Sequence, residues 1–345
     1  MREQPLWGWI LPVLLGGLAW WLGTSAPIIG GPVLGILMGL VVGQLAGQVP
    51  AWSAGVKFHA KRVLQGSIVL LGAGMSLVEV ARIGGAGLPV MIGTIVVAVG
   101  VGIPLSRALK VERETGALVT YGTTICGASA IATMSQVMGA RAGAVAVSIA
   151  VIVLYNVLAA VLFPALGLAM GLTPTSFGLW AGTAVNDTSS VVAASTSFDA
   201  QLMATGVVVG GMTAASYAVV VKLTRTLMLV PLALFQQWFG NRSLPESERQ
   251  HTVWWRMVPG FLVLFLVAAG LRTLGVIPDE VAPALTLLAH IGTTIAMTAV
   301  GMSSSLTAIR AAGWRPLALG GILWALIALT SLGLQAATGQ LAFLG

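Results

Sequence analysis

An acidic residue, Asp187, lies near the middle of a long apolar run, Phe177 to Ser197. The other nine acidic residues of the chain fall at the ends of apolar runs or between them. A charge at mid-bilayer costs roughly 2.5–3.5 kcal/mol on insertion scales, so such a residue usually faces a cavity or a partner. With Asn186 beside it, Asp187 is a candidate to bind a coupling cation or proton, and Thr188 and Ser189 are candidate substrate-binding residues. The alternative role of Asp187 is an internal ion pair.

Two basic residues, Lys222 and Arg225, lie inside another apolar run, residues 203–238. They are three positions apart and therefore share one face of a helix. An arginine beside a lysine suits an oxyanion such as sulfate, a sulfonate or a carboxylate. If the helix is broken near Gly210 and Gly211, both side chains can instead extend toward the cytoplasmic surface.

A polar interruption also divides the run 115–138. Its glycines and hydroxyl residues weaken a helix at membrane depth, which is tolerated only where protein or a watery cavity satisfies the backbone. An exposed half-helix N-terminus there would attract an anion. In the alternative, the hydroxyls bond back to their own helix, and the cysteine is only a small packing residue. The candidate substrate-binding residues of this interruption are Thr123, Thr124, Cys126, Gly127 and Ser129.

A third polar group lies in the run 282–304, where Thr293 and Thr294 follow His290. We assign the threonines to substrate binding and the histidine to ion coupling, although a lone histidine is often structural. The sequence contains no metal-ligand spacing and no phosphate-binding loop. We therefore expect neither an enzyme nor ATP-driven transport, and no resident cofactor beyond a coupling Na⁺ or H⁺.

The composition indicates an integral membrane protein. The 345 residues are 57% hydrophobic and only 8% charged, with a mean hydropathy of +0.97, whereas soluble domains carry about 25% charged residues. One cysteine excludes an internal disulfide. Long continuous apolar runs favour helices over a β-barrel. We predict an all-α fold with eleven transmembrane helices, at 6–23, 29–46, 60–78, 86–105, 115–138, 143–170, 175–197, 203–238, 256–275, 282–304 and 315–338.

The basic residues predict the orientation of these spans. Twelve of the seventeen fall on the side of the N-terminus, three on the other side, and the last two are Lys222 and Arg225. The positive-inside rule then places the N-terminus in the cytoplasm and the C-terminus in the periplasm. The basic residues that raise the pI of the protein lie mostly in loops. We therefore expect the lipid bilayer, and not nucleic acid, to be the partner of this protein. The longest polar stretch, Asn241 to Arg256, is a predicted cytoplasmic loop.

Short echoes suggest internal symmetry. Gly74-Met-Ser76 recurs as Gly301-Met-Ser303 in a span that runs the opposite way, and Gly122-Thr-Thr-Ile125 recurs as Gly292-Thr-Thr-Ile295. The two echoes imply different registers. Inverted repeats are typical of secondary transporters. We predict one transporter domain with an extra helix at 1–28 and repeats at 29–170 and 175–338.

Glycines at every fourth position predict close helix packing in the second span. We also read this stripe as exposed, which makes a homodimer plausible. Its residues are Gly31, Gly35, Gly39, Gly43 and Gly47.

Three strings together resemble the proposed sulfate exporter family of bacterial inner-membrane proteins. They are Gly122-Thr-Thr-Ile-Cys-Gly-Ala-Ser-Ala-Ile131, Gly182-Thr-Ala-Val-Asn-Asp-Thr-Ser-Ser-Val-Val-Ala-Ala194 and Lys222-Leu-Thr-Arg-Thr-Leu-Met-Leu-Val-Pro231. Some members of that family carry histidine and glutamate where this chain has Asn186 and Asp187. The family is grouped with bile-acid/sodium symporters and cation/proton antiporters. The resemblance therefore implies two inverted five-helix repeats with two broken, crossing helices.

These observations favour a secondary transporter of a small anion that works by alternating access in the bacterial inner membrane. Lys222 and Arg225 would attract the anion, while Asn186 and Asp187 would handle a coupling ion. A cation/proton antiporter centred on Asp187 is the first alternative. The second is a membrane scaffold or sensor whose polar interruptions only lock helices together. The direction of transport and the identity of the substrate stay open.

Overall fold

The chain folds as a helical bundle in a computed structural model that describes residues 6–25, 30–47, 49–206, 212–241, 258–278 and 280–344. Within these ranges the regular structure is helical, apart from one isolated β-bridge between Leu172 and Phe343. The predicted all-α class is confirmed. Gly210, Gly211 and nearly all of the predicted loop Asn241 to Arg256 lie outside the described residues.

Six helical segments in the described part of the chain are long and apolar enough to cross a membrane. They are α1 (Trp7–Ser25), α5 (Leu77–Ala108), α8 (Ala142–Ala169), α11 with α12 (Ala214–Leu227 and Leu229–Asn241), α14 (Ala282–Ser303) and α16 (Trp314–Ala337). Two shorter apolar helices are α2 (Gly31–Ala46) and α13 (Gly260–Thr273). The remaining single helices are η2 (Pro50–Trp52), the continuous series α3 (Ser53–Phe58), η3 (His59–Val63) and α4 (Leu64–Gly72), and the short α15 (Leu306–Ala311).

Two further segments are each divided into a pair of short helices. The first pair is α6 (Arg113–Thr124) and α7 (Ala128–Met138), and the second is α9 (Pro174–Ala184) and α10 (Thr188–Ala204). The breaks at 125–127 and 185–187 coincide with the polar interruptions in the sequence. Both pairs therefore carry predicted site residues at their centre.

The first pair is a re-entrant hairpin rather than one interrupted span. Arg141, just after α7, pairs with Glu112 and Glu114 at the start of α6. In addition, α6 runs parallel to α8, since Ser148 bonds to Thr115 O near the start of both helices and Gly122 contacts Ile152 further along. The chain therefore enters the bundle along α6, turns at 125–127 and returns along α7.

The second pair is also a hairpin, and it enters from the opposite end. Gly178 of α9 lies against Ala214 O and the Cβ of Tyr217, and Gly182 lies against Val221, so α9 and α11 run parallel. Since α11 begins where α10 has just ended, α9 begins at that same end. Residues 115–138 and 175–197 are two of the eleven spans predicted from the sequence, but both segments turn back at their midpoints. Hydropathy measures apolar length and does not register a reversal of direction.

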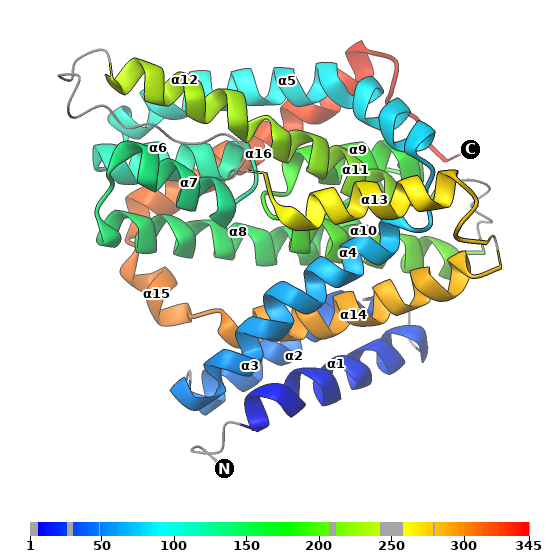
Figure 1. Cartoon of the computed structure of the whole chain (residues 1–345). Coiled ribbons are helices and arrows are strands. Elements are labelled where there is room, and N and C mark those ends of the chain that lie inside the picture. Colours follow the sequence, from blue (N-terminus) through cyan, green and yellow to red (C-terminus); the bar gives the residue numbers. More distant parts are fainter. Residues whose placement is uncertain are drawn as a thin grey trace.

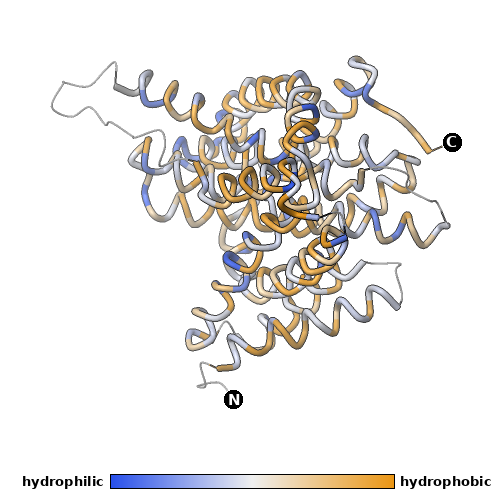
Figure 2. Tube along the Cα trace, turned by 45° about the vertical axis from the view of Figure 1, so that its right-hand side comes forward, coloured by the Kyte–Doolittle hydropathy of each residue, from blue (hydrophilic) through white to orange (hydrophobic). Residues whose placement is uncertain are grey.

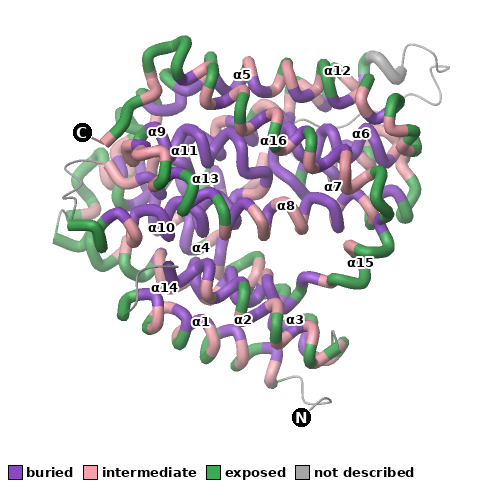
Figure 3. The backbone as a smooth tube through the Cα atoms, turned by 180° about the vertical axis from the view of Figure 1, so that it is seen from behind, coloured by how far each residue is buried: buried purple, intermediate pink, exposed green. Residues whose placement is uncertain are grey.

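The helices run side by side across the molecule, with α1, α2, α3 and α14 on one side of the bundle (Figure 1). The two hairpins, α8 and α11 form the other, more deeply buried part (Figure 3). Apolar residues continue along the outer helices (Figure 2), where large side chains such as Leu14, Trp21 and Leu329 are exposed. Such a surface suits a lipid environment.

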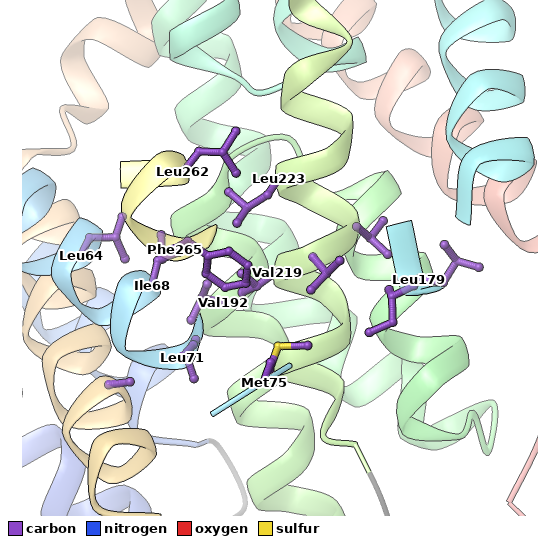
Figure 4. Close-up of a cluster of buried hydrophobic side chains, with 14 of the residues drawn as sticks. Leu64, Ile68, Leu71, Met75, Leu179, Val192, Val219, Leu223, Leu262 and Phe265 are labelled. Carbon is purple, nitrogen blue, oxygen red and sulfur yellow. The ribbon is translucent and has the colours of Figure 1, made fainter. Parts of the chain in front are cut away.

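One apolar cluster joins the two parts of the bundle. It gathers side chains from α4, α9, α10, α11 and α13 (Figure 4). Ile68 and Leu71 of α4 face Val192 of α10 and Phe265 of α13, and all four are almost completely buried. This contact fixes α4 beside the second hairpin, so that α4 and the hairpin can form opposite walls of a site.

The glycine stripe brings α2 against α14. A Cβ added to Gly39 would collide with the backbone of Thr298 and Met302, and Gly35 and Gly43 face the same helix. The predicted close packing is confirmed, but four of the five glycines are buried within the chain, and of the five Gly47 alone, at the end of α2, is exposed. The stripe therefore gives no support to a homodimer.

We expect Gly39→Ala to lower the melting temperature of the purified protein by several degrees, because the added methyl would push α2 away from α14. Gly17 of α1 has no atom within 4 Å of an added Cβ, so Gly17→Ala is the matched control. In that variant the better helix propensity of alanine stabilises by roughly 0.5–1 kcal/mol. Equal melting temperatures for the two variants would contradict the close approach.

Asp199 is a second acidic residue in the interior, although the sequence places it at the edge of an apolar run. Its side chain is only 2% exposed. The carboxylate accepts hydrogen bonds from the backbone N–H groups of Ala214 (2.8 Å) and Ala215 (2.9 Å). Since the first N–H groups of a helix have no partner within it, Asp199 satisfies the N-terminus of α11 and joins that helix to the second hairpin.

Candidate functional site

The tips of the two hairpins meet in the interior of the bundle. A Cβ built on Gly127 would lie 3.3 Å from the Cβ of Asp187 and 3.6 Å from Asn186 O. Lys222 of α11 joins both tips, because its Nζ donates to Ile125 O (2.7 Å) and to Val185 O (2.8 Å). The polar interruptions, sixty residues apart in sequence, thus form one site.

Local sequence explains why each hairpin turns where it does. Gly127 has φ 64° and ψ −127°, a conformation that residues with a Cβ rarely adopt. At the other tip, Asp187 has an extended backbone and is the N-cap of α10. Its carboxylate accepts from the N–H of Ser189 at 3.0 Å and from the Ser189 hydroxyl. Asp187 is a favoured N-cap residue, so the sequence itself starts α10 at this point.

The four helix ends at the tips differ in the groups that satisfy them. The C-terminal ends of α6 and α9 carry the partial negative charge of the helix dipole, and Lys222 neutralises both. At the N-terminal ends, α10 is capped by the carboxylate of Asp187, whereas Gly127 supplies no side-chain cap to α7. The Cys126 thiol accepts from the Ala130 N–H, so the N–H groups of Ala128 and Ser129 give α7 its uncapped positive end at the tips.

A cavity of about 430 Å³ borders the free N-terminus of α7. Ser129 is exposed and lines it, as do Asp187 and Ser189 of the second hairpin. Besides apolar groups, its lining contains the polar residues Lys61, Gln65, Ser129, Asn156, Asp187, Thr188, Ser189 and Ser190. Lys61 and Gln65 come from η3 and α4, so both parts of the bundle contribute to the wall.

Asn156 of α8 is a site residue that was not predicted from the sequence. Its side chain is 8% exposed, and its Oδ1 accepts a hydrogen bond from the Asp187 N–H at 3.1 Å. The amide group therefore holds the tip of the second hairpin and still borders the cavity. Asn156 is the polar residue within the apolar stretch Ile149–Ala160, and that isolation in the sequence was the signal for it.

The two predicted anion ligands on α11 lie behind the tips rather than on the cavity wall. Lys222 and Arg225 are both 0% exposed, and neither lines the cavity. The three guanidinium nitrogens of Arg225 have no hydrogen-bond partner among the described residues. Cys126 is buried in an apolar cluster with Ile131 and Met134. The two cations can therefore act on the cavity through their field, not by direct contact.

The remaining candidates divide between two places. Thr123 and Thr124 bond back to Val119 O and Thr120 O within α6, and Asn186 is buried at the tip with its Oδ1 unpartnered in the described structure. By contrast, His290, Thr293 and Thr294 are on α14, away from the tips. In the described part of the chain no three His, Cys, Asp or Glu residues gather as a metal site would require.

Comparison with known proteins matches residues 7–320 to the family model described as conserved hypothetical protein 698. A UPF0324 membrane protein of Streptococcus pyogenes is 37% identical over 98% of both chains. One from Fusobacterium nucleatum is 34% identical over 98% of this chain and 99% of its own. A third, from Streptococcus pneumoniae, is 35% identical over 95% of each chain. By its sequence, its helical fold and its apolar surface, the chain is a membrane protein that belongs to this UPF0324 family.

Proposed function

We propose that the protein is a secondary active transporter of a small anion, such as sulfate, a sulfonate or a carboxylate. The observation that carries the proposal is the meeting of two re-entrant hairpins, tip to tip, beside a cavity of about 430 Å³. Backbone that leaves the helix at membrane depth is tolerated where it lines a cavity. Discontinuous helices with their ends at the midplane are typical of substrate and ion sites in secondary transporters.

The charges around the tips favour an anion. Lys222 and Arg225 lie behind the tips, and Lys61 borders the cavity. Asp187 is the acidic residue among the cavity-lining groups, and its Oδ2 already caps α10. The free N-terminus of α7 adds a partial positive charge. An anion bound at Ser129 and the first N–H groups of α7 would compensate this excess.

The same elements give a topology for the transporter in the bacterial inner membrane. We propose nine crossing segments and two hairpins, one entering from each side. Because Arg141 pairs with Glu112 at the start of α6, it lies on the same side of the membrane as the other loop cations. Arg82 and Arg272 are then the basic residues expected on the side opposite the N-terminus. The positive-inside rule then makes the side of the N-terminus cytoplasmic and that of the C-terminus periplasmic.

An inverted repeat is part of this proposal. The sequence echo between Gly74-Met-Ser76 and Gly301-Met-Ser303 relates α4 to α14 and α5 to α16, and each helix packs against its counterpart. The two hairpins would be related in the same way, and so would α8 and α11. In this register the first repeat ends with its hairpin and α8, whereas the second repeat begins with its hairpin and α11. The echo between residues 122–125 and 292–295 is then a chance match.

A cation/proton antiporter remains the second candidate because of one observation. The carboxylate of Asp187 accepts its hydrogen bonds in the described structure through Oδ2, which leaves Oδ1 to face the cavity. That oxygen could bind Na⁺ or H⁺, either as the transported ion or as the coupling ion of an anion transporter. An anion-dependent and a cation-dependent response would separate the two functions.

We expect Ser129→Glu to abolish anion binding while leaving the fold intact. The new carboxylate would sit in the first turn of α7, where an acidic side chain stabilises a helix by about 0.3–1 kcal/mol. It would thus occupy the position proposed for the anion. Thermal-shift titration of the purified protein with sulfate, a sulfonate, a carboxylate and NaCl measures binding, and proteoliposome flux measures transport.

The control for this variant is Gln136→Glu, which places the same charge on the exposed face of α7. It should keep the anion response of the wild type. If Ser129→Glu still transports the anion at the wild-type rate, the proposed position of the anion is wrong. If no anion or cation changes the melting temperature of the wild-type protein, and it transports none of them, the result would favour a membrane scaffold or sensor over a transporter.

A further inference from the structure

A second, smaller cavity lies between the same two parts of the bundle. It has a volume of about 90 Å³ and is bounded by α1, α2, α10 and α14. His290, Thr294 and Thr196 give it a polar lining. The Nε2 of His290 is buried and has no hydrogen-bond partner in the described structure. A buried polar atom without a partner is costly. The small cavity can therefore offer His290 Nε2 as a hydrogen-bonding group to a polar ligand.

Helix α10 runs from one cavity to the other. Thr188 and Ser190 line the wide cavity at its N-terminal end, and Thr196 and Ala200 line the small cavity further along. Between them lies Ala193, which is completely buried. With a rise of about 1.5 Å per residue, the two chambers are separated by roughly two turns of this helix.

Two other helices show the same order. On α14, Val300 lines the wide cavity, Met297 is completely buried, and Thr294 and His290 line the small cavity. On α2, which meets the small cavity at its start, Ile36 lies beyond Gly31 and is also completely buried. The chambers are therefore successive along one interface.

An apolar layer separates the two chambers. Ile36, Ala160, Ala193 and Met297 form one contact cluster, and each is 0% exposed. Val157 and Val300, which border the wide cavity, pack against the same cluster. We call these four residues the apolar barrier. Along α10 the barrier lies between Ser190 and Thr196, each three residues from Ala193.

We propose that the small cavity is a second chamber of the anion pathway, closed off from the wide cavity by the apolar barrier. The anion leaving the N-terminus of α7 passes Ala193 and Met297 and is received by His290 Nε2 and the Thr294 region. The structure is then a state in which the wide cavity, with Lys61, and the small cavity, with His290, are not connected. This inference rests on the proposed transport function, but the accessibility of the two chambers can be measured without it.

Cysteine accessibility tests the order of the chambers. Cys126 is the single cysteine of the chain and is buried, so the wild type reports background labelling. Ala132→Cys places a thiol in the wide cavity and Ala200→Cys places one in the small cavity. A negatively charged methanethiosulfonate reagent, added to oriented vesicles from the Lys61 side, should label Ala132→Cys and spare Ala200→Cys. From the opposite side it should label Ala200→Cys.

Removing the barrier should join the chambers. When Met297→Ala is added to Ala200→Cys, we expect labelling from the Lys61 side to become at least tenfold faster. Sulfate leakage from proteoliposomes that carry Met297→Ala alone should rise by a similar factor. Met91→Ala removes an equally buried methionine from α5, in a different cluster, and should change neither rate.

The outcomes separate the two proposals. If the wild type transports no anion but Met297→Ala exposes Ala200→Cys, the transport function fails and the two chambers with their barrier stand. If the wild type transports an anion but Met297→Ala leaves both labelling and leakage unchanged, the barrier and the second chamber are refuted. Labelling of Ala200→Cys from the Lys61 side in the presence of Met297 would also refute them.

Discussion

Lys222→Met is expected to lower the melting temperature of the protein by several degrees and to reduce anion flux at least tenfold. The substitution leaves Ile125 O and Val185 O, two buried carbonyls at helix C-termini, without their donor. Each unsatisfied buried group costs about 1–3 kcal/mol. Relief from burying an ammonium offsets part of this loss, but both hairpin tips lose their common anchor.

Arg225→Met provides the opposite case on the same helix. Arg225 is as deeply buried as Lys222, but its guanidinium has no partner among the described residues. Methionine would remove an unpaired buried charge, which favours the folded state, so the melting temperature should hold or rise while anion affinity falls. Lys57→Met, at an exposed position of α3, controls for the loss of surface charge.

Differential scanning fluorimetry and proteoliposome flux measure these effects. If Lys222→Met melts like the wild type, Lys222 does not hold the tips together. If flux is unaffected by Lys222→Met and also by Arg225→Met, the anion assignment is wrong. In that case the response to Na⁺ and pH would decide for or against the antiporter.

Asp187→Asn is expected to keep the fold and to reduce transport at least tenfold. Asparagine is about as good an N-cap as aspartate, so the bond to the Ser189 N–H should survive and the stability should change little. The charge that faces the cavity is lost, and with it the binding of a coupling Na⁺ or H⁺. Ion-gradient-driven uptake in proteoliposomes measures the coupling.

Asp187→Ala separates the two roles of this side chain. Alanine removes the cap as well as the charge, and loss of an N-cap typically costs about 1 kcal/mol. We therefore expect equal losses of transport in the two variants but a lower melting temperature only for Asp187→Ala. Wild-type, gradient-dependent uptake by Asp187→Asn would show that Asp187 is only a cap.

Much of the site could be predicted from residues that are costly in a membrane. Asp187, Gly127 and Ser129 stand out in an apolar sequence, and the structure brings them to one cavity. The contribution of Lys61 could not be predicted in this way, because a lysine near the end of a span is ordinary. Its place depends on how α4 packs against the hairpins, a tertiary contact that no local pattern encodes.

The direction of the chain at the tips is the larger part of the fold that the sequence left open. Gly127 and Asp187 indicate where a helix stops, but a stop is compatible with both a kink and a reversal. The reversal is decided by distant partners, such as Arg141 with Glu112 and the parallel contact of Gly182 with Val221. Hydropathy therefore located both segments but treated each hairpin as a single span.

The anchoring of both hairpins by one lysine has a consequence for biosynthesis. Ile125 and Lys222 are 97 residues apart, so the first hairpin is synthesised long before its anchor. Neither α6 nor α7 is long enough to cross a bilayer of about 30 Å on its own. The first hairpin must therefore remain at the membrane surface, or be held by another protein, until α11 has been synthesised. We expect chains truncated before Lys222 to leave residues 113–138 accessible to protease.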